Sequence, residues 1–219
     1  MSEPGSSETG PTVHLGVPVV RPAEPRDVPR IAATLTVSLA ESRWVRWALP
    51  VDGRTQRLTR LAELDAHRAV ATGTAWVSED VEAVASWEAP EGAAAPLPRD
   101  VRTALEREVP RLHADRADAV ARTDAALAAA LPDGPHWRLR ALATRPRSRR
   151  RGLGGAVLAP VLDRCDADGV PAALVAPAWA VVRWARALGF EVTAATRSAD
   201  GQLPLWVAVR PPGVPMPEL

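Results

Sequence analysis

The chain has 219 residues, of which 47% are apolar, so it is long enough to bury one sizeable hydrophobic core. Its 27 basic residues, all of them arginine, nearly balance 26 acids, which excludes a global field that would attract nucleic acid or a membrane. The single cysteine, Cys165, excludes an internal disulfide, and no run approaches the roughly 20 apolar residues that cross a bilayer. With no signal-peptide pattern in Met1–Gly10, these features predict a cytoplasmic protein that is a monomer or a homodimer.

The two ends of the chain differ in composition from its middle. Residues 1–12 are rich in Ser, Glu, Gly and Pro and show no periodicity, which predicts a flexible tail. Residues 212–219 form a second, proline-rich tail. Residues 13–211 between them are expected to form a single domain.

In chain order, the first element expected is an edge strand around Val19, interrupted by Pro18. A helix follows, which Asp27 is expected to cap and in whose first turn Pro29 lies. Its buried stripe is predicted at Val28, Ile31, Leu35 and Leu39, which recur at helical spacing.

Residues 41–50 are expected to be a short irregular stretch that holds Trp44, Arg46 and Trp47. Aromatic side chains in such a stretch are candidates for the wall of a substrate cleft. They are equally suited to covering the hydrophobic core, and the sequence leaves both interpretations open.

The following elements are a helix at Arg54–Ala71, ended by Gly73, and a hairpin of two strands, Thr74–Val77 and Val81–Trp87. Residues 100–131 then predict an alanine-rich helical region broken near Pro110. His113 lies in that region with Asp115, Asp118 and Asp124. These acids alternate with arginines four residues away, which favours a solvated helix face over a metal site.

The part of the chain most informative about function begins at Trp137. Residues 137–143 alternate with a period of two, which predicts a strand with Arg138 and Arg140 on one face. After the run Arg149-Arg150-Arg151-Gly152-Leu153-Gly154-Gly155, apolar residues recur four apart and predict a helix. Glycines let the backbone approach a ligand closely, and the first amides of a helix lack acceptors. The sequence therefore predicts an anion site, with a phosphate as its natural ligand.

Two common phosphate motifs do not fit this stretch. A Walker loop requires a lysine, and the chain has none. A Rossmann loop requires a different glycine spacing and an acid after the next strand. The pattern Arg149-x-x-Gly152-x-Gly154, followed by Leu188-Gly189-Phe190, instead resembles the GNAT family of acyl-coenzyme A transferases, and its puromycin N-acetyltransferase-like actinobacterial members in particular.

This resemblance implies an α/β (α+β) fold, with a central mixed sheet of about seven strands, a splayed parallel pair and flanking helices. It implies an acetyl-coenzyme A-dependent N-acetyltransferase that acts on a small-molecule amine, such as an antibiotic or a biosynthetic intermediate, without a metal. The residues that it assigns to the coenzyme are Leu142, Ala143, Thr144, Arg149, Arg150, Arg151, Gly152, Leu153, Gly154 and Gly155. Trp179 and Trp184 join Trp44, Arg46 and Trp47 as candidates for the substrate cleft.

The chain departs from the family where catalysis is concerned. Ala185 occupies the position of the tyrosine that protonates the leaving thiolate, and the sequence has no tyrosine. Val181 and Val175 replace an asparagine and a glutamate that relatives carry. Cys165 is not expected to act as a nucleophile, because its stripe faces the core and no histidine is near it. The catalytic residues are therefore unknown from sequence.

Three hypotheses remain open at this stage. The chain is an active N-acetyltransferase that uses water as the acid, or a repurposed member whose apolar cleft acts on a hydrophobic molecule. The third hypothesis is a non-catalytic module that binds acetyl-coenzyme A or an apolar ligand.

Overall fold

The structure is a computed structural model that describes residues 18–216, so the tail predicted at residues 1–12 lies outside it. The strands of this part are Val20–Pro22 (β1), Ala75–Ser78 (β2), Ala83–Glu88 (β3), Trp137–Thr144 (β4), Ala172–Ala176 (β5), Glu191–Arg197 (β6) and Pro204–Arg210 (β7). The α-helices are Val28–Leu39 (α1), Arg43–Ala48 (α2), Arg54–Ala71 (α3), Arg99–His113 (α4), Ala117–Ala128 (α5), Leu153–Asp168 (α6) and Trp179–Arg186 (α7). Short 3₁₀ turns lie at Pro25–Asp27 (η1), Ala114–Arg116 (η2) and Pro146–Ser148 (η3).

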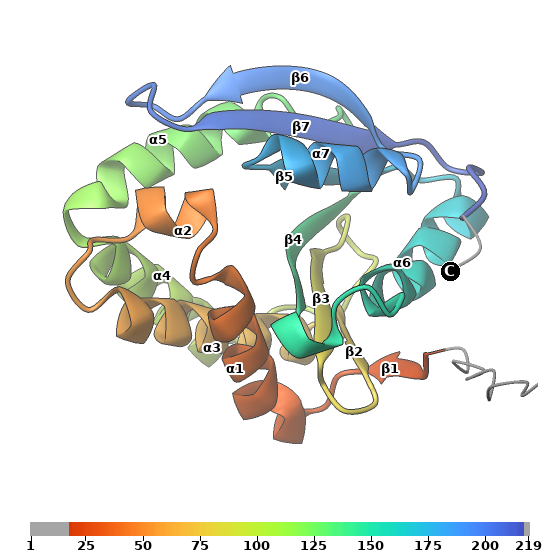
Figure 1. Ribbon diagram of the computed structural model, residues 1–219, viewed down its shortest axis with the longest axis horizontal. Coiled ribbons are helices and arrows are strands. Elements are labelled where there is room, and N and C mark those ends of the chain that lie inside the picture. The colour runs from red at the N-terminus through yellow and green to blue at the C-terminus, as the bar shows by residue number, and fades with distance from the viewer. Residues whose placement is uncertain (1–17, 217–219) are drawn as a thin grey trace, which may run out of the picture.

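The strands form one mixed sheet in the order β1-β2-β3-β4-β5-β7-β6. All neighbouring strands are antiparallel except β4 and β5, which run parallel and diverge along their length (Figure 1). The crossover between these two strands is α6, as a parallel pair requires. The predicted mixed sheet with a parallel pair and flanking helices is therefore confirmed.

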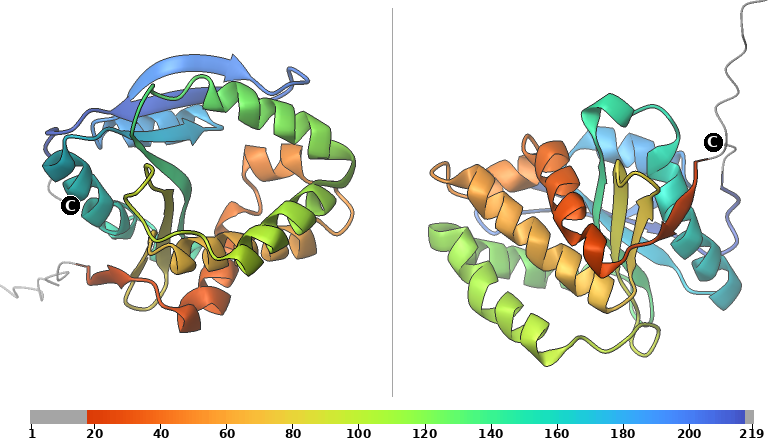
Figure 2. Two further views of the ribbon diagram at one scale, coloured as in Figure 1. Left: turned by 180° about the vertical axis from the view of Figure 1, so that it is seen from behind. Right: turned by 90° about the horizontal axis from the view of Figure 1, so that it is seen from below.

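Helices cover both faces of the sheet (Figure 2). On one face, α6 and α7 bury a core against the centre of the sheet that includes Val157, Leu162 and Phe190. On the opposite face, α1 and α3 pack over β2 and β3, around Ile31 and Val84. A separate cluster on that face joins α2 and α5 to β7 and consists of Trp47, Ala48, Val120, Leu127, Leu203, Leu205 and Val207.

Strand β4 contains a β-bulge that the alternating pattern did not predict. Opposite it on β3, Ser86 pairs with Ala141 and Trp87 pairs with Leu139, so Arg140 is an extra residue. The bulge reverses the alternation, because one inserted residue changes the face of every side chain after it. Leu139 accordingly packs in the α6 core, whereas Ala143 packs on the α1 side.

Three local expectations were wrong. Residues 43–48 form a helix, α2, instead of an irregular stretch, because Ser42 caps it by accepting a hydrogen bond from the Val45 amide at 3.1 Å. The helical region after residue 99 continues through Pro110 and breaks at Ala114, where φ is +49°. Asp27 does not cap α1 with its side chain, because its carboxylate binds Arg21 at 2.6 and 2.9 Å and accepts from the Glu24 amide at 2.8 Å.

The segment after β7 lies against the domain. Arg210 is fully buried and donates to both carboxylate oxygens of Asp166 on α6, at 2.8 and 2.9 Å. The amide of Gly213 donates to the same carboxylate at 2.7 Å. Val214 covers Gly189 so closely that a Cβ there would lie 2.5 Å from its Cγ1, which explains the glycine after α7. Residues 213 and 214 are thus tied to α6 and α7.

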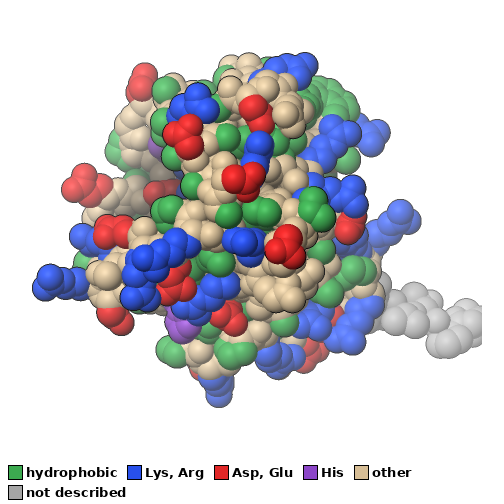
Figure 3. All heavy atoms as spheres, turned by 90° about the vertical axis from the view of Figure 1, so that its left-hand side faces the viewer, with side chains coloured by type: hydrophobic (Ala, Val, Ile, Leu, Met, Phe, Trp, Pro, Cys, Tyr) green, Lys and Arg blue, Asp and Glu red, His purple; other side chains and the backbone are tan. Residues whose placement is uncertain are grey.

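The surface agrees with the balanced composition. On the side of the molecule where α2, α4 and α5 lie, arginine and acidic side chains are interspersed (Figure 3). No helix within residues 18–216 is both long and apolar enough to pass through a membrane.

Candidate active site

The loop that joins β4 to α6 carries the predicted anion site, and two of its residues have a left-handed backbone. Arg150 adopts φ +61° and Gly152 adopts φ +74°. Glycine takes this conformation without cost, whereas an arginine there carries about 1–2 kcal/mol of strain. Strained residues of this kind cluster at ligand sites, where the surrounding structure must hold them in place.

Glu82, in the turn before β3, anchors the start of this loop. Its carboxylate accepts hydrogen bonds from Arg147 at 2.6 and 3.0 Å and from the Ser148 hydroxyl at 2.9 Å. The hydrogen bond from Arg147 is the main cause that lowers the pKa of Glu82 to about 2, against the opposing effect of burial. The Arg145 amide also donates to the Glu82 carbonyl, at 2.8 Å. Sequence reasoning missed this anchor because Glu82 lies 65 positions before Arg147.

The three consecutive arginines of the loop differ in their contacts. Nε of Arg149 donates to the Thr144 carbonyl at 3.2 Å. Arg150 and Arg151 are exposed, and neither guanidinium hydrogen bonds to another residue within the described range 18–216. Two positive charges therefore stand beside the start of α6 with their donors available to a ligand.

The first turn of α6 adds amide donors to this positive charge. Its first amide with a helical acceptor is that of Ala156, which donates to the Gly152 carbonyl at 3.0 Å. The amides of Leu153, Gly154 and Gly155 precede it, at the positive end of the helix dipole. This combination of amides, dipole and arginines suits a phosphate or pyrophosphate.

Three elements meet at Gly154. A Cβ at this position would lie 3.6 Å from Oγ1 of Thr144 on β4 and 3.8 Å from Cζ2 of Trp184 on α7. These are ordinary contact distances, so an alanine would fit and a larger side chain would fill the space between the elements.

The neighbouring part of β4 has an open edge. Strands β4 and β5 pair only at Trp137, Arg138 and Leu139, although β4 continues to Thr144. The predicted coenzyme residues Leu142, Ala143 and Thr144 all lie beyond this pairing. Ala143 is buried with its side chain toward α1, while Thr144 is half-buried beside Gly154. The structure therefore brings the end of this strand, at Thr144, next to Arg149 and Gly154 of the loop.

Ala185, the position of the family's acid, lies in the core. Its exposed fraction is 0%, and it packs in the same cluster as Val182 and Leu188. Trp184, the residue before it, is half-buried and reaches Gly154. Val181 and Val175 are half-buried and apolar. Within the described residues, none of the positions 175, 181 and 185 therefore supplies an acid or a base.

The tryptophan candidates for a substrate cleft lie on opposite faces of the sheet, so they do not form one common wall. Trp184 packs against the core on the α6 and α7 face. Trp179 is 47% exposed and contacts Trp206 edge-on, with ring centroids 5.7 Å apart. Trp44 and Trp47 pack instead in the cluster between α2, α5 and β7. The sequence could not reveal this separation, because it depends on which sheet face each helix covers.

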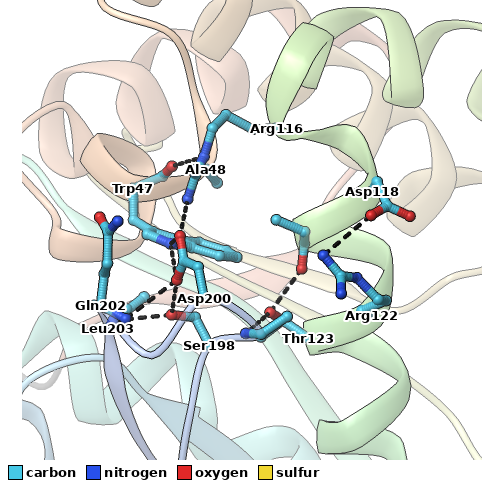
Figure 4. Close-up of polar contacts among 12 residues, drawn as sticks. Trp47, Ala48, Arg116, Asp118, Arg122, Thr123, Ser198, Asp200, Gln202 and Leu203 are labelled. Atoms are coloured by element: carbon cyan, nitrogen blue, oxygen red, sulfur yellow. Dashed lines mark hydrogen bonds and ion pairs between the residues drawn. The ribbon is translucent and has the colours of Figure 1, made fainter.

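Trp47 belongs to a polar network that joins α2 to the turn between β6 and β7 (Figure 4). Its Nε1 donates to Asp200 at 3.0 and 3.1 Å, and Arg116 donates to the same carboxylate at 2.6 Å. Ser198 and the Gln202 amide also donate to it, at 2.6 and 3.1 Å. Hydrogen bonds from Ser198 and Arg116 lower the pKa of Asp200 well below its usual range. Asp200 was not predicted from sequence.

Two further residues singled out by the sequence have surroundings of other kinds. Arg46 is exposed and forms an ion pair with Glu41 at the surface. Cys165 is fully buried in the α6 core, and burial raises the pKa of its thiol to about 12. A thiol with that pKa stays protonated near neutral pH, so the expectation that it is no nucleophile agrees with its surroundings.

Solved structures with the same arrangement are acetyltransferases. The histone acetyltransferase HPA2 and related acetyltransferase from Corynebacterium glutamicum superposes with a TM-score of 0.62 at 24% identity, over 90% of this chain and 98% of that one. A polyamine N-acetyltransferase from Drosophila melanogaster superposes with a TM-score of 0.54 at 16% identity, over 88% of this chain and 99% of that one. A GCN5-related N-acetyltransferase from Rhodopseudomonas palustris superposes with a TM-score of 0.53 at 13% identity, over 92% of this chain and 99% of that one. No protein-family model matches the sequence.

The chain has the GNAT fold. In this GNAT fold the glycine loop, the open edge of β4 and the start of α6 adjoin one another, as the loop resemblance implied. The resemblance to puromycin N-acetyltransferase-like members stays a prediction.

Proposed function

We propose that this GNAT-fold protein is an acetyl-coenzyme A-dependent N-acetyltransferase that acts on a small-molecule amine by direct transfer. One observation carries the proposal: the unpaired edge of β4 ends beside a strained arginine and glycine loop at the start of a helix. An extended arm that ends in a pyrophosphate matches both parts, because the edge offers backbone partners and the loop offers positive charge.

In this proposal the amides of residues 153–155 and the side chains of Arg150 and Arg151 bind the pyrophosphate. The pantetheine arm lies along residues 142–144, in the gap that β5 leaves. Trp184 and Thr144 flank the passage between the two parts, since both approach Gly154.

The reaction needs a neutral amine whose nitrogen attacks the thioester carbonyl. The carbon–nitrogen bond forms, the carbon–sulfur bond breaks, the nitrogen loses one proton and the departing thiolate gains one. Ala185 cannot supply that proton, and the arginines remain charged near neutral pH. We infer that water delivers the proton to the sulfur.

The acceptor class is part of the proposal. The polyamine N-acetyltransferase of Drosophila melanogaster catalyses the formation of N-acetylagmatine, so an amine acceptor occurs on this fold. The resemblance to puromycin N-acetyltransferase-like members favours an antibiotic or a biosynthetic intermediate as the acceptor here.

A second candidate function is binding of an acyl-coenzyme A without turnover. The observation that favours it is the buried alanine at position 185, where relatives carry a phenol. A positioned general acid contributes roughly 10²- to 10⁴-fold to a rate, so a protein without one is slow or inactive.

Calorimetric titration with coenzyme A and thiol release from acetyl-coenzyme A with an amine panel test the proposal. We expect Gly154→Asp to abolish binding, because its carboxylate enters the space meant for a phosphate. Gly154→Ala is the matched control, since its Cβ meets neighbours at ordinary contact distances. We expect it to fold with an unchanged melting temperature and to keep measurable affinity.

The outcomes separate the candidates. Binding with thiol release that depends on an amine supports the transferase, whereas binding without release supports the second candidate. Equal affinity of the wild type and Gly154→Asp, with both folded, contradicts the assignment of the loop.

A further inference from the structure

A group of charged side chains lies on the sheet face opposite to α6 and has no part in the proposed coenzyme site. It comprises Asp65 and Arg68 of α3, Ser86 and Glu88 of β3, Asp124 of α5, and Arg138 and Arg140 of β4. The neighbouring clusters on this face, around α1 and around α5, are apolar. The charged group therefore lies between these two apolar clusters, on a part of the sheet face that neither of them covers.

Arg138 and Arg140 lie side by side within this group. Both guanidinium groups approach the same oxygen of Glu88, at 3.9 and 3.7 Å. These distances are those of loose ion pairs, and Glu88 is 55% exposed. Within residues 18–216, neither arginine donates a hydrogen bond to a protein acceptor.

The two arginines differ from the solvated arginines of the surface. The side chain of Arg138 is only 17% exposed, and burial, followed by the charge of Arg140, lowers its pKa. Two adjacent cations with unused donors in a partly desolvated place repel each other. An anion placed between them would remove this cost and accept their hydrogen bonds.

Asp124, on α5, forms no ion pair with either arginine among residues 18–216. Burial raises its pKa, whereas the charges of Arg140, Arg138 and His113 oppose that shift. The donors of the two arginines are therefore not occupied by Asp124.

Asp65 shows what a purely structural carboxylate looks like in the same place. It accepts hydrogen bonds from Arg68 at 2.8 and 3.1 Å and from the Ser86 hydroxyl at 2.6 Å. Its donors are all provided by the protein, and it offers little to a ligand. Arg138 and Arg140, by contrast, form only the loose ion pairs with Glu88 and no hydrogen bond among residues 18–216.

The position of the two arginines relates them to the coenzyme site. Arg140 is the bulged residue of β4, and it is the first residue of that strand beyond the pairing with β5. The open edge that we assign to the pantetheine arm, residues 142–144, follows directly. The two arginines therefore adjoin that edge.

We propose that Arg138 and Arg140 border the acceptor site and that the acceptor is an amine that also carries a carboxylate, which these two arginines bind. The inference rests on the proposed acetyl transfer, because it specifies the substrate of that same site. It separates this protein from transferases for purely cationic amines, whose acceptors have no group for two arginines.

Matched acceptor pairs test the proposal. Thiol release from acetyl-coenzyme A is measured with leucine and leucinamide, phenylalanine and phenylalaninamide, and β-alanine and its amide, which differ only in the carboxylate. We expect kcat/KM for the carboxylates to exceed that for the amides by about 10- to 100-fold, as for hydrogen bonds to a charged group.

Substitutions test whether the preference for a carboxylate depends on the two arginines. Arg138→Gln and Arg140→Gln are expected to abolish the preference for the carboxylate, and Arg140→Glu to reverse it in favour of the amide. Arg122→Gln is the control, because Arg122 pairs with the exposed Asp118 on the same helix as Asp124. Its preference should equal that of the wild type.

Affinity for coenzyme A is measured by calorimetry on the wild type and on each variant. This measurement distinguishes a failure of the proposed function from a failure of the acceptor inference. A wild type that does not bind coenzyme A overturns the proposed function. A wild type that binds coenzyme A but acetylates amides as well as carboxylates, or acetylates no carboxylate of the panel, overturns the acceptor inference alone. Loss of the preference in Arg122→Gln to the same degree as in Arg140→Gln also contradicts it.

Discussion

Arg116 and Arg150 carry the same charge, but only the guanidinium of Arg116 finds hydrogen-bond acceptors within the protein. Arg116 donates to the Trp47 carbonyl at 3.0 Å and to Asp200 at 2.6 Å, and it lies over the Trp47 ring. Arg150 is exposed in a strained loop and hydrogen bonds to no described residue. The comparison separates arginines whose partners the protein provides from arginines whose partners must come from a ligand. We expect the first kind to control stability and the second kind to control binding.

The largest expected effect on stability is in the network around Arg116. Trp47→Ala removes a buried ring and the donor to Asp200, and it should lower the free energy of unfolding by about 3–5 kcal/mol. Trp179→Ala is the matched control, because its ring is 47% exposed and should cost about 1 kcal/mol or less. Urea unfolding measures both. If both variants lost the same free energy of unfolding, the network around Arg116 would not be more important for stability than an exposed ring.

Ala185 lies in the core, where the protein provides all of its contacts, although the resemblance to the GNAT family implied an acid at this position. Ala185→Tyr should lower the free energy of unfolding by up to about 3 kcal/mol, because a ring does not fit beside Val182 and Leu188 without displacement. Thermal unfolding measures the loss. A stable variant with faster thiol release would instead show that position 185 faces the thioester.

Glu82 sharpens the comparison, since it ties the ligand loop to the scaffold. Its pKa of about 2 lies below the usual value of 4.5, so its stabilising contribution is present above pH 4.5 and is lost as pH falls toward 2. The contribution is about 2 kcal/mol at most, because the exposed Arg147 leaves the pair screened by solvent. Urea unfolding of the wild type and Glu82→Gln should differ at about pH 6, and the difference should shrink below pH 4.5 and disappear only at about pH 2 and below. A difference that persists in acid would contradict this role.

The smallest expected change in stability belongs to the loop arginines. Arg150→Ala and Arg151→Ala should each alter the free energy of unfolding by less than about 0.5 kcal/mol, as surface changes do. Each should weaken coenzyme A binding by about 10-fold or more through the loss of hydrogen bonds to a phosphate. Calorimetry with Arg122→Ala as the control measures the affinity. Unchanged affinity in both loop variants would place the pyrophosphate elsewhere.

Much of the fold followed from local patterns. The helix expected at Arg54–Ala71 begins and ends at these residues in the structure, and the strands expected at Thr74–Val77, Val81–Trp87 and 137–143 lie within two residues of β2, β3 and β4. Such elements depend on side chains two to four positions apart, so a short stretch of sequence specifies them. Residues 149–155 belong to the same class, because the glycines and the helix start are consecutive.

By itself the sequence thus determined the order of elements, the glycine loop and the absence of a phenol at position 185. Only the tertiary structure decided that Trp47 and Trp184 lie on opposite faces of the sheet. It also decided that Trp47 donates a hydrogen bond to Asp200, which is 153 positions later in the chain. It alone brought Arg138 and Arg140 to the same carboxylate oxygen of Glu88. The physical reason is that strand register, the bulge at Arg140 and the face that each helix covers depend on packing between distant segments, which no local spacing encodes.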